Sequence, residues 1–485
     1  MTVSLLPSLL LCGLAAEPIP VGSSRQLLID GRFIAASSAI TLRVNPPAKR
    51  GPVLLRDRPW EAKDVGFCVS VAEYEGRYMM WYMARTADGA IRQCLALSDD
   101  GVAWEKPSLG VVEFEGSRDN NIVLDGICET TVFVDPIAPP DERFKTVSVM
   151  NWPDPETGGI YVHTSPDGIH WRKSTRRVLP FCPDTANQAF WDTRLRKYVA
   201  NIRVWAPMRK VGRVEMDDIT QVWPFTPVDA PYHIWGADKI AVTSREVPIV
   251  FGYDNKDPVP SDHYNAACVQ YPWADDAYLM FPSAYRHFAE PPVGKYGNDG
   301  LLDIQLAASR DGVQWDRPSR QPYIGLSLEG EGDSSQLYMA VGMLRRGDRL
   351  LQYYGGYHAT HGALDAVDGD GAIYLAEQRL DGFVSADAGT EGGELTTPPL
   401  TFSGRRLVLN IDAGAMGMCR VGLLDADGKA IPGFGLGDCD EIGGNSTARV
   451  VTWHGAEDVS ALADPPIRLT FKMRSAKLYG FEFEA

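Results

Sequence analysis

The sequence predicts an all-β protein: a five-bladed β-propeller followed by a small β-sandwich. The phrase Ser-x-Asp-Gly-x-x-Trp occurs three times, at 98–104, 165–171 and 309–315, each time after a short alternating apolar run. Clusters of such runs recur at intervals of roughly sixty to seventy residues, which suits a four-stranded blade with its loops. None of these clusters shows helical periodicity.

The repeated phrase describes a strand that runs into a tight turn. The Asp carboxylate can accept hydrogen bonds from turn amides, and the Gly supplies a positive φ that a Cβ would disfavour. The Trp returns as a large apolar side chain that can cover the edge of a sheet. Three copies indicate a repeated structural unit. A sandwich is the rival fold, but its turns would not repeat one motif at blade spacing.

The strand clusters also define the domains. The propeller clusters begin near residues 64, 130, 189, 264 and 336, and the later strands lie near 407–409, 421–424, 467–471 and 478–481. A linker rich in Gly, Thr and Pro, 391–399, separates the two sets. We therefore expect the propeller over 17–388 and the sandwich over 389–485.

The first residues predict export. Residues 1–16 are expected to form a signal peptide, because Leu5 to Ala16 is apolar and small residues stand at Gly13 and Ala15. The mature protein is then periplasmic or extracellular. No later stretch is long and apolar enough to span a bilayer.

Composition narrows the class of ligand. The formal net charge of −16 argues against a nucleic-acid partner, which would need clustered cationic side chains. The 12 Trp and 19 Tyr offer aromatic faces on which sugar rings can stack. Eight cysteines show no zinc spacing, although Cys419 and Cys439 could pair. We expect no cofactor, and a structural calcium ion is left open.

Three phrases carry a resemblance to known families: WYMARTADGAIRQCLALSDDGVAWEKP at 81–107, YLMFPSAYRH at 278–287 and YLAEQRLDGF at 374–383. With the propeller and sandwich pattern, the chain resembles glycoside hydrolase family 32, and its propeller alone resembles family 43. The resemblance implies a carbohydrate substrate bound over the central axis, where the innermost strand of each blade begins. The Asn-Asp-Pro-Asn and Arg-Asp-Pro motifs of family 32 are missing, so retaining fructosidase chemistry is not supported.

A carboxylate precedes or begins every propeller cluster. Cleavage of a glycosidic bond uses two carboxyl groups, one protonated and one ionised, and carboxylates brought together raise one another's pKa. By the resemblance, a first-blade residue acts as base or nucleophile, a second- or third-blade residue tunes the pKa, and a later Glu is the acid. Any one of these carboxylates could instead cap a turn. The candidate catalytic residues are Glu61, Asp64, Glu129, Asp184, Glu331 and Asp333.

Other residues are candidates for substrate binding. Trp60 could stack on a sugar, or it could simply pack against the first blade. An Arg recurs near the end of the second strand of three blades, where it could face the axis or form ion pairs between blades. The spacing His358-x-x-His361 leaves a metal site open. The candidate binding residues are Trp60, Arg85, Arg203, Asp262, His263, Tyr264, Arg286 and His358.

The sequence thus favours an exported glycoside hydrolase that works through carboxylates at the propeller axis. A non-catalytic propeller that binds glycans stays open as the alternative, because the same ring of polar residues could recognise a sugar without cleaving it. A purely structural surface protein would need a large exposed apolar face, which the sequence does not identify.

Overall fold

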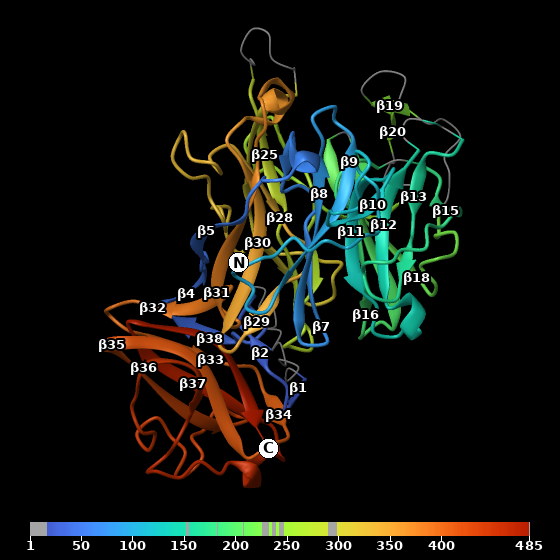
Figure 1. The fold of residues 1–485 in the computed structure, drawn as a ribbon. Coiled ribbons are helices and arrows are strands. Elements are labelled where there is room, and N and C mark those ends of the chain that lie inside the picture. Colours follow the sequence, from blue (N-terminus) through green and yellow to red (C-terminus); the bar gives the residue numbers. More distant parts are fainter. Residues whose placement is uncertain are drawn as a thin grey trace, which may run out of the picture. The chain divides into compact units, whose positions relative to one another are not determined.

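This computed structural model describes residues 17–151, 154, 156–181, 183–206, 208–225, 232–234, 239–241, 247–289 and 298–484. The chain forms two compact units, Arg43–Val384 and the combination of Met1–Leu42 with Ser385–Ala485. Strands dominate both units, as predicted, and the helices are short 3₁₀ turns (Figure 1). Among the described residues, no helix has the length and apolar character needed to cross a membrane. The predicted signal peptide, residues 1–16, lies outside the described part.

The larger unit contains five successive groups of strands. Group one comprises β6 (Asp64–Val65), β7 (Ser70–Tyr74), β8 (Arg77–Arg85), β9 (Ile91–Ser98) and β10 (Ile122–Asp125). Group two comprises β11 (Cys128–Val134), β12 (Phe144–Met150), β13 (Gly159–Tyr161), β14 (Thr164–Ser165) and β15 (Arg177–Leu179). Group three comprises β16 (Gln188–Asp192), β17 (Lys197–Trp205), β18 (Arg209–Met216) and β21 (Ile249–Phe251).

The fourth and fifth groups complete the unit. Group four comprises β22 (Ser261–His263), β23 (Cys268–Gln270), β24 (Tyr278–Met280), β25 (Ser283–His287), β26 (Gly300–Ile304) and β27 (Ala307–Ser309). Group five comprises β28 (Gln336–Met339), β29 (Leu344–Arg346), β30 (Arg349–Tyr357), β31 (Ala372–Arg379) and, from the start of the unit, β5 (Ala48–Leu54). Short elements lie between them: η1 (Pro59–Glu61), η2 (Pro140–Glu142), the pair β19 (Tyr232–Ile234) and β20 (Lys239–Ala241), and η4 (His361–Ala366).

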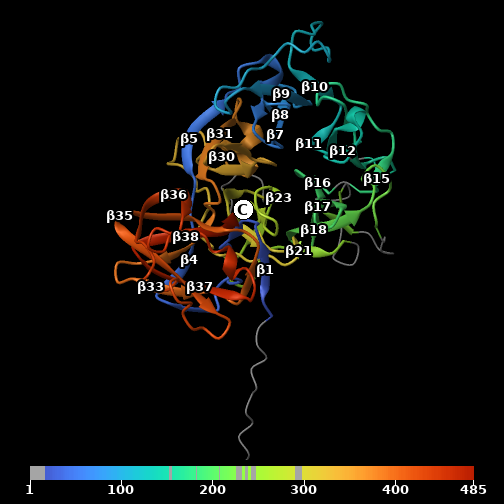
Figure 2. The same cartoon turned by 90° about the horizontal axis from the view of Figure 1, so that it is seen from below.

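Hydrogen bonds between neighbouring groups close these strands into a ring (Figure 2). Each bond joins residues at or next to the inner strands of two successive groups, and the last one returns from group five to group one. The pairs are Ser70 with Val132, Thr131 with Asn187, Gln188 with Cys268, Ser283 with Leu337, and Val341 with Val71. The predicted propeller-like arrangement is therefore confirmed.

The number of blades depends on how the sheets are counted. One residue pair, Leu302 with Gln336, joins β22, β25 and β26 of group four to group five in a single eight-stranded sheet, while β23, β24 and β27 form a separate three-stranded sheet. Strand β5 forms the outer edge of that sheet by pairing antiparallel with β31. The ring therefore closes between an early and a late segment of the chain.

The three Ser-x-Asp-Gly turns have the predicted geometry. In the first, the Ser98 hydroxyl accepts the Gly101 amide at 2.9 Å, and Asp100 accepts the amides of Val102 and Ala103 at 2.7 and 2.8 Å. The turns at Ser165 and Ser309 repeat these bonds. The glycines have φ values of 72–73°. Backbone amides lower the pKa of Asp100, because they stabilise the ionised carboxylate.

Each turn is also held by another part of the ring. A side chain from the preceding group donates a hydrogen bond to the carbonyl of the turn glycine. The three pairs are Tyr353 with Gly101 at 2.6 Å, Trp81 with Gly168 at 2.8 Å, and Arg213 with Gly312 at 3.0 Å. The repeated phrase therefore joins neighbouring groups as well as ending strands.

The smaller unit has strands from both ends of the chain. Its N-terminal strands are β1 (Ile19–Gly22), β2 (Gln26–Leu27), β3 (Ala36–Ser38) and β4 (Ile40–Val44). Its C-terminal elements are β32 (Val384–Ala388), β33 (Gly393–Thr396), β34 (Leu400–Phe402), β35 (Arg406–Asp425), β36 (Ile442–Val450), η5 (Ser460–Leu462), β37 (Ile467–Arg474) and β38 (Ala476–Glu484). The long β35 pairs with β38 along its first half and with β37 along its second half.

Two expectations change for this unit. Residues 17–42, expected in the propeller, pair with C-terminal strands instead: β1 with β34, β2 with β38, and β3 with β33. These pairings satisfy backbone groups that would otherwise form open edges. Cys419 and Cys439, considered as a pair, are separate buried thiols.

Candidate active site

A cavity of about 270 Å³ lies within the larger unit, among loops and strands of its groups. Group one supplies Asp64, Phe67, Met83, Arg85 and Ile91. Group two supplies Glu129, and group four supplies Tyr264. Group five supplies Tyr338, Tyr357, His361, Leu364 and Asp365. The cavity thus collects side chains that are far apart in the sequence.

Asp64 and Arg85 form one wall of the cavity. They face each other as a cross-strand pair of β6 and β8, and the Arg85 guanidinium donates a hydrogen bond to the Asp64 carboxylate. Arg85 also contacts Asp365 at 3.1 Å. Burial raises the pKa of Asp64 although Arg85 lowers it, and the negative charges of Asp365 and Asp370 add to the rise.

Glu129 contributes a second carboxylate from the beginning of β11. The side chain is half-buried and lines the same cavity. Its backbone has a φ of 43°, and the residues in the corresponding loops of groups one and three, Cys68 and Asp184, have φ values of 53° and 65°. Left-handed backbone is costly for residues with a Cβ, and such strain gathers at functional sites.

Asp184 stands behind this wall and is connected to it through Arg203. The guanidinium of Arg203 is ion-paired with Asp184, donates to the Tyr264 carbonyl at 2.6 Å and lies 4.2 Å from the centre of the Tyr264 ring. Burial raises the pKa of the Tyr264 hydroxyl, and the charges of Asp184 and Glu129 raise it further. The first three groups therefore bring Asp64, Glu129 and Asp184 to one neighbourhood.

Asp262 lies deeper in the same region and does not line the cavity. It accepts a hydrogen bond from Arg209 at 2.8 Å, and His287 lies 3.4 Å away. Burial raises the pKa of Asp262, but the nearby His287 and the hydrogen bond from Arg209 outweigh this effect and lower the pKa. The Arg209 guanidinium lies 5.2 Å from the Tyr264 ring centre. Asp262 thus supports Tyr264 indirectly.

Aromatic rings make up much of the remaining surface. Tyr264 makes edge contacts with Phe67, Tyr338 and His361, at ring-centre distances of 6.1, 5.5 and 4.9 Å. His361 begins η4, which also supplies Leu364 and Asp365. Within the described residues, no group of three or more His, Cys, Asp or Glu side chains is placed to hold a metal ion.

Trp60 and Glu61 do not reach this cavity. Trp60 is buried, donates to Asn121 at 2.9 Å and packs on Phe114. Glu61 is fully buried in the wall of group one, where it accepts hydrogen bonds from Tyr82 and Lys106, both at 2.7 Å. The short η1 turn folds both side chains back toward their own group.

Glu331 and Asp333 also lie apart from the cavity. Glu331 is exposed and accepts the Leu328 amide at 3.0 Å within a turn. Asp333 is buried and bonded to Lys49 at 2.8 Å and Tyr354 at 2.9 Å. Burial raises the pKa of Asp333, but these bonds outweigh it and lower the pKa. Both residues have contacts typical of structural carboxylates.

Three further binding candidates point elsewhere. His263 is buried against Phe251, and burial lowers its pKa to about 4. Arg286 is exposed and donates to the Pro260 carbonyl. His358 is exposed, with its ring 2.7 Å from Asp370. None of the three lines the cavity.

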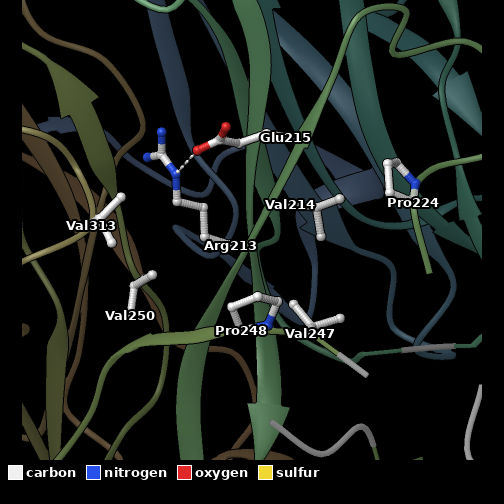
Figure 3. A pocket seen from close by; sticks show the side chains of 8 residues that line it. All are labelled: Arg213, Val214, Glu215, Pro224, Val247, Pro248, Val250 and Val313. Atoms are coloured by element: carbon white, nitrogen blue, oxygen red, sulfur yellow. Dashed lines mark hydrogen bonds and ion pairs between the residues drawn. The ribbon is translucent and has the colours of Figure 1, made fainter. Parts of the chain in front are cut away.

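A second cavity, of about 310 Å³, has a different character (Figure 3). Its lining is formed mostly by valines and prolines: Val214, Val247, Val250, Val313, Pro224 and Pro248. Its two charged residues, Arg213 and Glu215, are bonded to each other at 2.8 Å. It offers no pair of carboxyl groups for acid–base chemistry, so the cavity around Asp64 and Glu129 is the candidate site.

Comparison with known proteins finds no matching family model and no matching curated protein. Similar solved structures include a chain named glycoside hydrolase, at 15% identity and a TM-score of 0.44, covering 69% of this chain and 92% of that one. An N-acetylgalactosamine deacetylase from F. plautii matches at 15% identity and a TM-score of 0.43, and the match covers 71% of this chain and 97% of that one. A thermostable family-43 glycoside hydrolase matches at 14% identity and a TM-score of 0.40, and the match covers 66% of this chain and 93% of that one. At TM-scores below 0.5, these matches assign no activity to this chain.

Proposed function

We propose that this protein is a glycoside hydrolase whose reacting carboxyl groups are Asp64 and Glu129. One observation carries the proposal: two carboxyl groups from successive strand groups line the same small cavity, together with several aromatic side chains. Pockets of this kind, with a few converging polar groups, are the usual sites for small ligands. Hydrolysis of a glycosidic bond needs two carboxyl groups of this sort.

The environment of each carboxyl group supports a role. Burial raises the pKa of Asp64, so Asp64 is the group better able to retain a proton and donate it to the glycosidic oxygen. Glu129, half-buried on the same cavity, would act as base or nucleophile. This assignment reverses the order implied by the family resemblance, in which the first-blade residue is the base. Asp184 would influence both through Arg203 and Tyr264.

One contact favours the alternative, a propeller that binds glycans without cleaving them. Arg85 is bonded directly to Asp64 and would stabilise its ionised form. An Asp64 that stays ionised could accept hydrogen bonds from sugar hydroxyls but could not act as the acid. Binding without product release from any sugar would favour this alternative.

The test is a screen of neutral aryl glycosides and oligosaccharides, with product release followed chromatographically. Glu129→Gln and Asp64→Asn should each lower turnover by about 10²–10⁴-fold, because each removes an acid–base group and keeps the side-chain shape. Circular dichroism should show an unchanged fold. Glu331→Gln is the control. If Glu331→Gln loses turnover and Glu129→Gln keeps it, the active site lies at the loop of Glu331 instead.

Export and the absence of a required metal also belong to the proposal. Sequencing the N-terminus of secreted protein should show cleavage after residue 16. Chelation should leave turnover and thermal stability unchanged, and a loss on chelation that calcium restores would reveal a structural ion.

A further inference from the structure

Two polar atoms in the group-five wall of the cavity lack partners in the described structure. The first is the Tyr357 hydroxyl. Tyr357 is 1% exposed, yet its oxygen makes no hydrogen bond to any described residue. The ring fits closely against Gly371, where a Cβ would lie 2.6 Å from a ring carbon. The hydroxyl is therefore held in place without being satisfied.

The second atom is Nε2 of His361, and its state follows from the other ring nitrogen. The Gln336 amide nitrogen donates to the Ala359 carbonyl at 2.7 Å, which fixes the orientation of that amide. Its oxygen then lies 2.7 Å from the Tyr338 hydroxyl and 3.2 Å from His361 Nδ1. The Tyr338 hydroxyl also lies 3.2 Å from Nδ1, but its one hydrogen is donated to the closer amide oxygen. Both neighbours of Nδ1 therefore accept, and Nδ1 carries the hydrogen.

The imidazole is also neutral. Burial, together with the cations Arg209 and Arg203, lowers the pKa of His361 to about 3 against the opposing effect of Asp184 and Asp299. A neutral ring with its hydrogen on Nδ1 leaves a lone pair on Nε2. No hydrogen bond from the described chain reaches that lone pair.

We propose that Tyr357 and His361 position the substrate by binding two hydroxyl groups of one uncharged sugar residue. One sugar hydroxyl donates to Nε2 of His361, and another sugar oxygen accepts from the Tyr357 hydroxyl. A buried atom without a partner, such as the Tyr357 oxygen, is costly, so a site keeps it where a ligand supplies the missing bond; the lone pair of His361 is open to the same ligand. The proposal rests on the proposed function for its reaction, and it concerns recognition alone.

The charges around the cavity favour an uncharged sugar over a uronic acid. Among the described lining residues, Asp64, Glu129 and Asp365 are acidic and Arg85 is the one permanent cation. Arg85 is already paired with Asp64 and Asp365. A ligand carboxylate would therefore meet like charges without a free cation to offset them.

Tyr357→Phe is the main test, with Tyr353→Phe as its matched control on the same strand. Tyr353 donates to the Gly101 carbonyl, so losing its hydroxyl should lower the melting temperature and leave KM unchanged. Tyr357→Phe should keep or raise the melting temperature, since it removes an unsatisfied group. It should raise KM about 10-fold or more. An unchanged KM, or a melting temperature as low as that of the control, would overturn the role of Tyr357.

His361 is tested by a pair of substitutions. His361→Phe should weaken binding about 10-fold or more, and His361→Gln should restore part of it through an amide oxygen that can accept. Wild-type KM should show no step near pH 6.5, where an ordinary histidine titrates. Equal binding by all three proteins, or such a step that disappears in His361→Gln, would contradict the assignment.

Calorimetry separates this inference from the proposed reaction. The probes are glucose, galactose, xylose and arabinose, with glucuronic and galacturonic acids for comparison. Binding of a neutral sugar that weakens in Tyr357→Phe supports the inference even if no glycoside is cleaved. Cleavage that is insensitive to Tyr357→Phe supports the reaction and refutes the inference. Binding of the uronic acids in preference to all four neutral sugars would also refute it.

Discussion

The polar atoms of the Ser-x-Asp-Gly turns are hydrogen-bonded, whereas some polar atoms of the cavity are not. In the turns, the serine hydroxyl, the aspartate carboxylate and the glycine carbonyl are all hydrogen-bonded. In the cavity, the Tyr357 hydroxyl and His361 Nε2 have no partners in the described chain, and burial raises the pKa of Asp64.

The difference separates what holds the ring together from what is available to a ligand. Fully paired groups stabilise the fold and have nothing left to offer a substrate. Polar groups that are buried without partners lower the free energy of unfolding, and a protein can retain them where a bound ligand supplies the missing hydrogen bonds. Pairing is therefore one guide to which polar residues hold the fold and which are available to a ligand.

Substitution of Glu61 gives the largest expected effect on stability, because the Glu61 carboxylate is fully hydrogen-bonded, as the polar groups of the turns are. Glu61→Gln would leave Lys106, whose side chain is 6% exposed, without its main buried counter-charge. We expect a loss of about 3–5 kcal/mol in the free energy of unfolding, which urea denaturation would measure. Turnover per folded molecule should not change. The exposed Glu113→Gln is the control, and equal stability of the two variants would remove Glu61 from the structural class.

Gly168 tests the turns themselves. Its φ is 73°, and a Cβ would lie 2.5 Å from the Trp81 ring, so Gly168→Ala adds backbone strain and a clash. We expect a loss of about 2–4 kcal/mol by thermal or urea unfolding. Gly110→Ala has a similar φ of 70° and open space around it, so it isolates the strain. Equal losses in the two variants would show that packing on Trp81 contributes nothing.

Asp303 tests the comparison from outside the cavity, where other residues, including Gln93, Asn201 and Gln352, also have buried polar atoms without partners among the described residues. It lies outside the cavity, but its Oδ1 is buried without a partner among the described residues, and burial raises its pKa to about 6 from an ordinary 3.8. Near pH 4 and below, the carboxyl is protonated in the folded protein, so little free energy is lost by burying it. As the pH rises through about 6, the buried carboxyl ionises and the free energy of unfolding falls.

Asp303→Asn should therefore raise the free energy of unfolding by about 1–3 kcal/mol near pH 8. The gain should vanish toward pH 4. Melting temperatures of both proteins across this range would show it. A variant that is less stable than wild type at every pH would mean that Asp303 has a partner of its own and belongs with the satisfied groups.

The sequence anticipates the parts of the fold that depend on local chemistry. The turn at Asp100 follows from residues within four positions of it. Asp64, Glu129 and Asp184 stand near the beginning of successive strand groups, and that position brings them together. The sequence points to His361 only through a possible metal spacing and does not point to Tyr357, because the proposed role of both residues depends on bonds that distant residues fail to make. The sequence predicts Glu61 at the axis because the residues next to it in the turn do not reveal that Lys106 is its partner.

The pairing of β5 with β31 has a consequence for how the protein is made. Leu54 lies opposite Ile373 and Ala48 opposite Glu377, so an early strand finds its neighbour only when the chain is nearly complete. During synthesis, the edge of β5 that will pair with β31 stays unpaired, and strands of other nascent chains could pair with it. Translation that stops before residue 372 would leave β5 and β30 each without the strand that pairs with it, and such unpaired edges favour aggregation.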